Sequence, residues 1–232
     1  MSIFARARQA LLEILYPEGA VCLGCGRISD GECLCPACRQ ELAYGSMLEA
    51  WSTRDLDGVP AWSARPHTGL PRKLVLELKH HAAGCAADAL AGMLRTRPAA
   101  FPEPEAGTVV TWVPGPKSRI RERMTDHGRL LAGAAARELG LPCRQLLRRR
   151  GNDRPQASLR EAERLKNLRK AFEPAGPVTF PVLLVDDVLT TGTTTRRCIA
   201  ALRAAGAERI TVLTMTYAAK RAGTVHGQAG RL

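Results

Sequence analysis

Apolar runs alternate with amphipathic segments along this chain, as they do where strands alternate with helices. Four apolar residues at 182–185 predict a buried strand that stops at Asp186 and Asp187, and residues 196–206 have helical periodicity up to a glycine. Further strands are expected at 56–64, 108–114, 146–150 and 209–215, and further helices at 69–81, 82–97 and 126–139. The alternation predicts an α/β fold with a parallel sheet and helices on both faces.

The turn between residues 182–185 and 196–206 suits a phosphate group. Its candidate phosphate-binding residues are Thr190, Thr191, Gly192, Thr193 and Thr194. Backbone N–H groups at a helix N-terminus have no intrahelical acceptor, threonine hydroxyls add donors, and glycine allows a close approach. Asp186 and Asp187, at the carboxyl end of the strand, can accept hydrogen bonds from ribose hydroxyls. The sequence therefore predicts a site for a phosphorylated sugar.

Five of the eight cysteines lie close together near the N-terminus. Two C-x-x-C pairs, separated by nine residues, supply Cys22, Cys25, Cys35 and Cys38. Four thiolates in a closed tetrahedral site favour zinc. Cys33 could replace Cys35 as a ligand or be a spectator thiol, and the doubled spacing favours Cys35. We expect a structural brace rather than a nucleic-acid contact surface, and we expect the other three thiols, Cys85, Cys143 and Cys198, to be buried.

Positive charge is concentrated in one segment. The net charge is +12, and residues 117–170 hold 16 Lys/Arg and six Asp/Glu, which is ten of those twelve charges. Such a field favours pyrophosphate or a nucleic-acid backbone, although a solvated basic surface would have the same composition. The segment contains no aromatic residue on which bases of a single strand could stack.

Hydropathy argues against membrane insertion. No run of apolar residues approaches the 18 that a membrane span needs, so no transmembrane helix is expected. Residues 3–15 have an apolar helical face, which we expect to pack on the protein rather than on a membrane. These patterns predict a cytoplasmic protein.

The hydrophobic strand, Asp186-Asp187 and the Thr-Thr-Gly loop resemble the 5-phosphoribosyl-1-diphosphate (PRPP) signature of type I phosphoribosyltransferases. Over most of its length the chain is similar to the ComF family, the competence-associated branch of these proteins. The blocks that carry the similarity are the two C-x-x-C pairs, the Leu-rich segment ending in Lys79, Val113-Pro114 with its following arginines, Arg148 to Gln156, Arg164-x-x-Asn167 and Ala171-Phe172. In one departure, Met124 stands where the family usually has a glycine of the pyrophosphate loop.

The resemblance implies a zinc module on a phosphoribosyltransferase core, with boundaries at 1–45 and 46–232. It implies that Asp186 and Asp187 orient ribose and Mg²⁺ in catalysis and that the Thr/Gly loop holds the 5-phosphate. Arg119 and Arg123 would neutralise pyrophosphate, and Arg148, Gln156 and Arg164 would lie on a closing loop.

Two functions follow from the same resemblance. One is a Mg²⁺-dependent phosphoribosyltransferase with an unidentified acceptor. The other is a protein that handles single-stranded DNA during uptake in natural transformation, using residues 117–170, with a competence helicase or DNA-processing proteins as partners.

Overall fold

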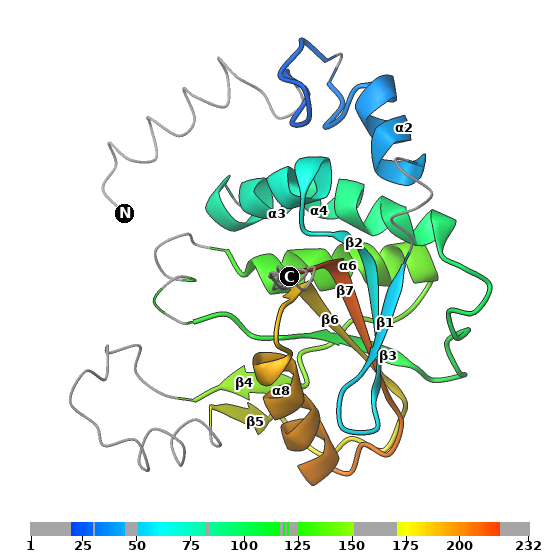
Figure 1. Ribbon diagram of the computed structural model, residues 1–232. Coiled ribbons are helices and arrows are strands. Elements are labelled where there is room, and N and C mark those ends of the chain that lie inside the picture. The colour runs from blue at the N-terminus through cyan, green and yellow to red at the C-terminus, as the bar shows by residue number, and fades with distance from the viewer. Residues whose placement is uncertain are drawn as a thin grey trace, which may run out of the picture.

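A five-stranded sheet forms the centre of the computed structural model (Figure 1). The structure describes residues 20–29, 31–44, 51–81, 84–116, 118, 120, 125–150 and 171–218. The sheet has the order β1-β2-β7-β6-β3, with β1 (Ser52–Asp55), β2 (Pro60–Pro66), β7 (Ile210–Tyr217), β6 (Val182–Leu189) and β3 (Val109–Trp112). All neighbouring pairs are parallel except β1 and β2, which are antiparallel.

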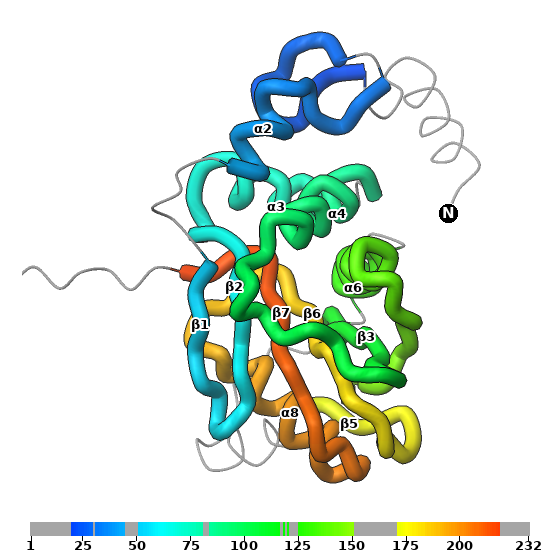
Figure 2. Tube along the Cα trace, turned by 90° about the vertical axis from the view of Figure 1, so that its right-hand side faces the viewer, coloured from blue at the N-terminus to red at the C-terminus, as the bar shows by residue number. Residues whose placement is uncertain are grey.

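Helices cover both faces of the sheet (Figures 1 and 2). One face carries α3 (Gly69–His81), α4 (Gly84–Ala91), a 3-10 helix η1 (Gly92–Thr96) and α6 (His127–Leu139). The other carries α8 (Thr193–Ala204) and a small hairpin of β4 (Leu147–Arg149) and β5 (Phe172–Pro174). Successive strand residues point to opposite faces, so Leu183 and Val185 pack in the first layer while Val182 and Leu184 pack in the second.

The parallel sheet with two helical layers confirms the predicted fold class, and several elements agree closely with the sequence pattern. The helix expected at 69–81 is α3. The Asp126 side chain accepts a hydrogen bond from Gly128 N at the start of α6, and Gly140 ends this helix with a φ of 66°. These are the side-chain cap and the left-handed glycine that commonly bound a helix.

Three expectations about elements were wrong. The strand expected at 56–64 begins only at Pro60 with β2, and residues 56–59 form a tight turn that joins β2 to β1, in which Asp57 and Gly58 have φ values of 59° and 78°. Asp-Gly at such a turn is a hairpin signal, because both residues tolerate positive φ. Residues 82–97 form α4 and then η1 instead of one helix. The signature strand does not stop at the two carboxylates but continues to Leu189, and β5 was not predicted.

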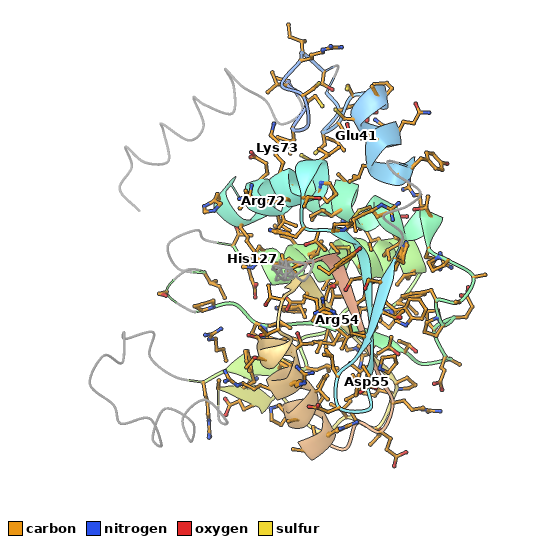
Figure 3. The ribbon with its side chains drawn as sticks, in the orientation of Figure 1. Glu41, Arg54, Asp55, Arg72, Lys73 and His127 are labelled. Carbon is orange, nitrogen blue, oxygen red and sulfur yellow. The ribbon has the colours of Figure 1, made fainter. Side chains whose placement is uncertain are left out.

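The cysteine segment packs on the α/β core through α2 (Pro36–Tyr44) (Figure 1). Cys38 and Leu42 of this helix join Leu70 and Leu74 of α3 in one hydrophobic cluster. Lys73 Nζ of α3 donates a hydrogen bond of 2.7 Å to Gly24 O, and Figure 3 shows Lys73 on the side of α3 that faces the cysteine segment. Because the two parts share core residues, the boundary between 45 and 46 stays a prediction.

The isolated cysteines differ in exposure. Cys198 is buried as expected, whereas Cys85 is only partly buried and Cys143 is exposed, so the expectation was wrong for Cys143. Cys143 lies in an isolated bridge beside the edge strand β3, where its neighbours do not cover it.

Within the described part of the chain, none of the helices combines the length and the apolar character that crossing a membrane requires.

Candidate functional site

An open pocket of about 510 Å³ lies where β6 ends and α8 begins. Its walls come from five places in the sequence: the end of α3, the loop after β3, the start of α6, the end of β4, and the end of β6 with the loop that leads to α8. Polar atoms dominate the lining, which includes Asp186, Asp187 and all residues from Thr190 to Thr195. The carboxyl ends of parallel strands are where open α/β sheets bind ligands.

The loop from β6 to α8 has the form of an anion-binding turn. Gly192 occupies the N-cap position of α8 with a φ of 78°, a conformation that glycine adopts without strain. The hydroxyls of Thr191 and Thr193 lie 2.9 Å apart. Because α8 has 12 residues and begins at Thr193, its unpaired N–H groups and its dipole are directed at the pocket lined by this loop.

The two carboxylates are not equivalent. Asp187 is buried, and both of its oxygens have protein partners: Lys79 Nζ lies 2.8 Å from Oδ1, and His127 Nε2 lies 3.4 Å from Oδ2. Lys79 comes from the last turns of α3. His127 comes from the start of α6, and it is labelled in Figure 3. The sequence placed both acids where the strand ends, but β6 continues past them to Leu189, and the Asp187 side chain is buried between Lys79 of α3 and His127 of α6.

The protonation of the pair differs accordingly. Burial opposes ionisation of Asp187, but the hydrogen bond from His127 and the charge of Lys79 lower its pKa below the usual aspartate value. Burial and then the neighbouring Asp187 carboxylate raise the pKa of Asp186 to about 8, against a 2.9 Å hydrogen bond from Asp187 N. The protein therefore stabilises the anion of Asp187, whereas the raised pKa of Asp186 favours its protonated form when no cation is bound.

The basic residues expected around the pocket are only partly described. Arg119, Arg123, Gln156 and Arg164 lie outside the described residues, as does Met124. Arg148 is exposed on β4 and is not among the residues that line the pocket, whereas its neighbour Arg149 is. Strand alternation explains this, because adjacent residues point to opposite faces. The Arg149 guanidinium also lies over the Phe172 ring at 5.5 Å.

Sequence reasoning missed part of this site. Lys79 was singled out only as the end of a Leu-rich segment, and His80 and His127 were not among the predicted site residues. All three line the pocket. The available signal was their position at helix ends beside the sheet edge where the ligand site was expected.

The four predicted metal ligands lie together. The sulfurs of Cys22, Cys25, Cys35 and Cys38 are all within 4.8 Å of one another, and this cluster does not include Cys33. Cys25 Sγ and Cys35 Sγ are 3.8 Å apart. A tetrahedral site with Zn–S bonds of about 2.3 Å has sulfurs separated by about 3.8 Å. The donor set therefore fits a metal ion of this kind.

Two thiols of this cluster differ in how readily they ionise. The backbone N–H groups of Cys25, Cys35 and Gly24 lower the pKa of Cys22 to about 6, although burial opposes this. Burial and hydrogen bonds with the neighbouring thiols raise the pKa of Cys38 to about 12. The Cys22 thiolate forms readily, whereas ionisation of the Cys38 thiol is opposed, and a bound dication would relieve that opposition.

Residues 125–230 match the family model of the phosphoribosyl transferase domain. This match and the mostly parallel α/β sheet show a phosphoribosyltransferase-like fold. Among curated proteins, none matches this sequence significantly.

Two solved structures are among those to which this chain is similar. One is described as the allosteric regulatory enzyme of purine biosynthesis, with 23% identity over 76% of this chain and a TM-score of 0.42. The other is glutamine PRPP amidotransferase from B. subtilis complexed with ADP and GMP, with 21% identity over 76% of this chain and a TM-score of 0.37. The chain spans 30% of the length of each of these proteins.

Proposed function

We propose that this protein binds PRPP together with Mg²⁺ and acts as a phosphoribosyltransferase. The observation that carries the proposal is one pocket that contains both the Thr190–Thr194 loop and the carboxylates Asp186 and Asp187. The loop would hold the 5-phosphate, and the carboxylates would face the ribose hydroxyls. The phosphoribosyl transferase match over residues 125–230 supports the same assignment.

Phosphoribosyl transfer depends mainly on positioning the substrate and neutralising its charge. Breaking the bond from ribose C1 to pyrophosphate develops positive charge on the ribose, so the protein contributes by holding the ends of PRPP and neutralising the departing pyrophosphate. Arg149 lines the pocket and is suited to that neutralisation. Arg119, Arg123, Arg148, Gln156 and Arg164 remain proposed for pyrophosphate binding and loop closure.

Asp186 is the better candidate of the two acids for a metal or ribose ligand. Lys79 and His127 already contact the two oxygens of Asp187, so Asp187 would act by keeping these two side chains in place. When bound, Mg²⁺ would neutralise phosphate oxygens, and it prefers carboxylate and phosphate ligands. Asp186 would lose its proton to serve as such a ligand.

Calorimetry with PRPP tests this proposal. The wild type should release heat with PRPP only when Mg²⁺ is present, and Asp186→Ala should lower the affinity at least about tenfold. Asp88→Ala, an exposed carboxylate paired with Arg137 far from the pocket lining, is the matched control and should bind normally. If the wild type releases no heat with PRPP, the pocket is a feature of the fold that no longer binds PRPP, and the proposal fails.

We propose that the four clustered cysteines bind one zinc ion that braces α2 against α3. The sulfur spacing of 3.8 Å and the position of Cys38 in the core cluster support this role. Metal analysis should give about one equivalent per chain. Cys35→Ser should lose zinc and Cys33→Ser should retain it; the reverse result would assign the fourth ligand to Cys33.

A second candidate function is single-stranded DNA binding during DNA uptake, as the resemblance to the ComF family implies. The exposed Arg148 and Arg150, within the segment of ten excess positive charges, favour it. Binding should weaken steeply with salt, by a log–log slope of roughly −0.7 per phosphate contact, and neutralising residues 148–150 should reduce both affinity and slope. A response that is flat with salt would favour the enzyme.

A further inference from the structure

The β1–β2 hairpin lies directly behind the loop that lines the pocket. We propose that Arg54 and Arg196 are positioning residues that hold this loop from behind and turn its N–H groups toward a bound phosphate. The inference rests on the proposed function, because it assumes that a phosphate occupies the loop.

Arg54 ties the loop to the end of the sheet. Its Nη1 donates to Thr190 O at 2.9 Å, and its Nη2 donates to Ala218 O at 3.2 Å. Ala218 is itself fixed, because its N–H donates to Leu189 O at 2.9 Å. The guanidinium therefore joins β1, β7 and the first loop carbonyl after β6. Arg54 lies between β1 and the start of α8 (Figure 3).

Arg196 holds the next carbonyl along the loop. Its Nη1 donates to Thr191 O at 2.9 Å, and its Nε lies 3.2 Å from Asp57 Oδ1 at the tip of the hairpin. Arg203 of the same helix donates to Asp57 O at 3.2 Å and so fixes the tip without touching the loop. Two successive carbonyls of the loop are thus each bound by a guanidinium.

Peptide geometry converts these two contacts into a direction for the N–H groups. In a planar trans peptide, the carbonyl of one residue and the N–H of the next point in opposite directions. Fixing the carbonyls of Thr190 and Thr191 therefore directs the N–H groups of Thr191 and Gly192 to the other side of the loop. That side is the pocket: all three of these residues line it, and within the described chain no residue of the β1–β2 hairpin does.

The packing behind Gly192 shows how closely the hairpin approaches. A Cβ at this position would lie 2.9 Å from a methyl of Leu56 and 3.0 Å from Arg196 Nη1. The loop backbone is therefore enclosed on one side by the hairpin and open on the other to the pocket. The hydrogen bonds from Arg54 and Arg196 also keep the two loop carbonyl oxygens, which would repel a phosphate, away from the site.

The test compares arginines that touch the loop with one that does not. Calorimetry on the full chain would measure binding of ribose 5-phosphate and inorganic phosphate to the wild type, Arg54→Gln, Arg196→Gln and the control Arg203→Gln. We expect Arg54→Gln and Arg196→Gln to weaken both probes about tenfold and Arg203→Gln to change them less than about twofold. Arg54→Lys, which keeps the charge but not the forked donors, should recover only part of the affinity.

A second readout separates positioning from general stability. In ¹H–¹⁵N spectra of the wild type, phosphate should shift the Gly192 amide; that shift should shrink in Arg54→Gln and Arg196→Gln at a temperature where each remains folded. If Arg54→Gln does not fold, Arg196→Gln and Arg54→Lys decide the question.

Three outcomes would overturn the inference. If the wild type binds PRPP while both loop-contacting variants bind the probes equally well, the inference fails and the proposed function stands. If Arg203→Gln loses as much affinity as the other two, the hairpin supports only stability. If the wild type binds neither PRPP nor the probes, the proposed function fails, and the inference with it.

Discussion

The cysteine cluster and the phosphate pocket are two sites built in opposite ways. All four sulfurs of the cluster come from the 17 residues between Cys22 and Cys38, whereas the pocket gathers side chains from Lys79 to Thr195. Ligand spacing along the chain is enough to define the first site. The second exists only when α3, α6 and β6 are packed together. The difference teaches that local spacing identifies ligands, while the charge balance of a site depends on residues that are distant in sequence.

Removing the metal should produce the largest effect and should separate the two sites. Chelation is expected to unfold α2 and the cysteine loops. The free energy of metal binding that is lost is on the order of 10 kcal/mol for a structural zinc site. The pocket should still bind PRPP, because among the described residues none of its lining comes from the cysteine segment. Hydrogen exchange of α2 and PRPP calorimetry would measure the two effects, and loss of PRPP binding on chelation would contradict the separation.

Asp186→Asn should alter the pH dependence of stability. The folded pKa of about 8 lies above the usual aspartate value of 3.8, so over this range the unfolded chain is ionised while the folded chain holds a proton. Wild-type stability should therefore fall as pH rises through this window, and the variant should escape that fall. Its advantage should grow by about 2 to 4 kcal/mol between about pH 5 and pH 8.

Denaturant titrations at several pH values would measure this change. Asp187 and Lys79, whose charges act on Asp186, are unchanged in the variant, so the difference reports on Asp186. Parallel stability curves for the two proteins would contradict the raised pKa.

Asp187→Asn should cost about 2 kcal/mol of folding stability, because it leaves the Lys79 ammonium without its carboxylate in a mostly buried place. Asp187 has the opposite pH dependence from Asp186. Its lowered pKa stabilises the folded chain at pH values above the usual aspartate pKa, and this stability is lost as pH falls through the folded pKa. Asp88→Asn, at the exposed pair with Arg137, is the control and should cost less than about 1 kcal/mol. Equal costs for the two variants would show that burial does not strengthen the pocket pair.

The smallest effect is expected at the link between the sites. Lys73→Met removes the exposed hydrogen bond to Gly24 O and should cost less than about 1 kcal/mol, with zinc content and PRPP affinity unchanged. Thermal unfolding, metal analysis and calorimetry on one preparation would check all three. A fall in PRPP affinity would reveal coupling through α3.

The sequence predicted the features that depend on neighbouring residues and missed the contacts between residues that are distant along the chain. The four clustered cysteines, the strand–loop–helix from Val182 to Ala204 and the caps of α6 follow from spacing, hydropathy and turn chemistry. The pairing of Lys79 with Asp187 joins residues 108 apart, which no pattern along the chain encodes. Arg149 lines the pocket and Arg148 does not. The sequence did not show this, because in a strand of three residues the alternation is too short to tell which side chains face the pocket.

The strand order has a consequence for solution behaviour. Exposed sheet edges are templates for pairing with other chains, and this sheet ends in β1 on one side and β3 on the other. β1 has only four residues and ends at the charged pair Arg54 and Asp55, features that discourage strand addition. The β3 edge is occupied by the segment around Cys143: Val110 N donates to Pro142 O, and Arg144 N donates to Val110 O, both at 2.9 Å. One border of the sheet is therefore occupied and the other is short and charged, and both features oppose edge-to-edge aggregation at high concentration.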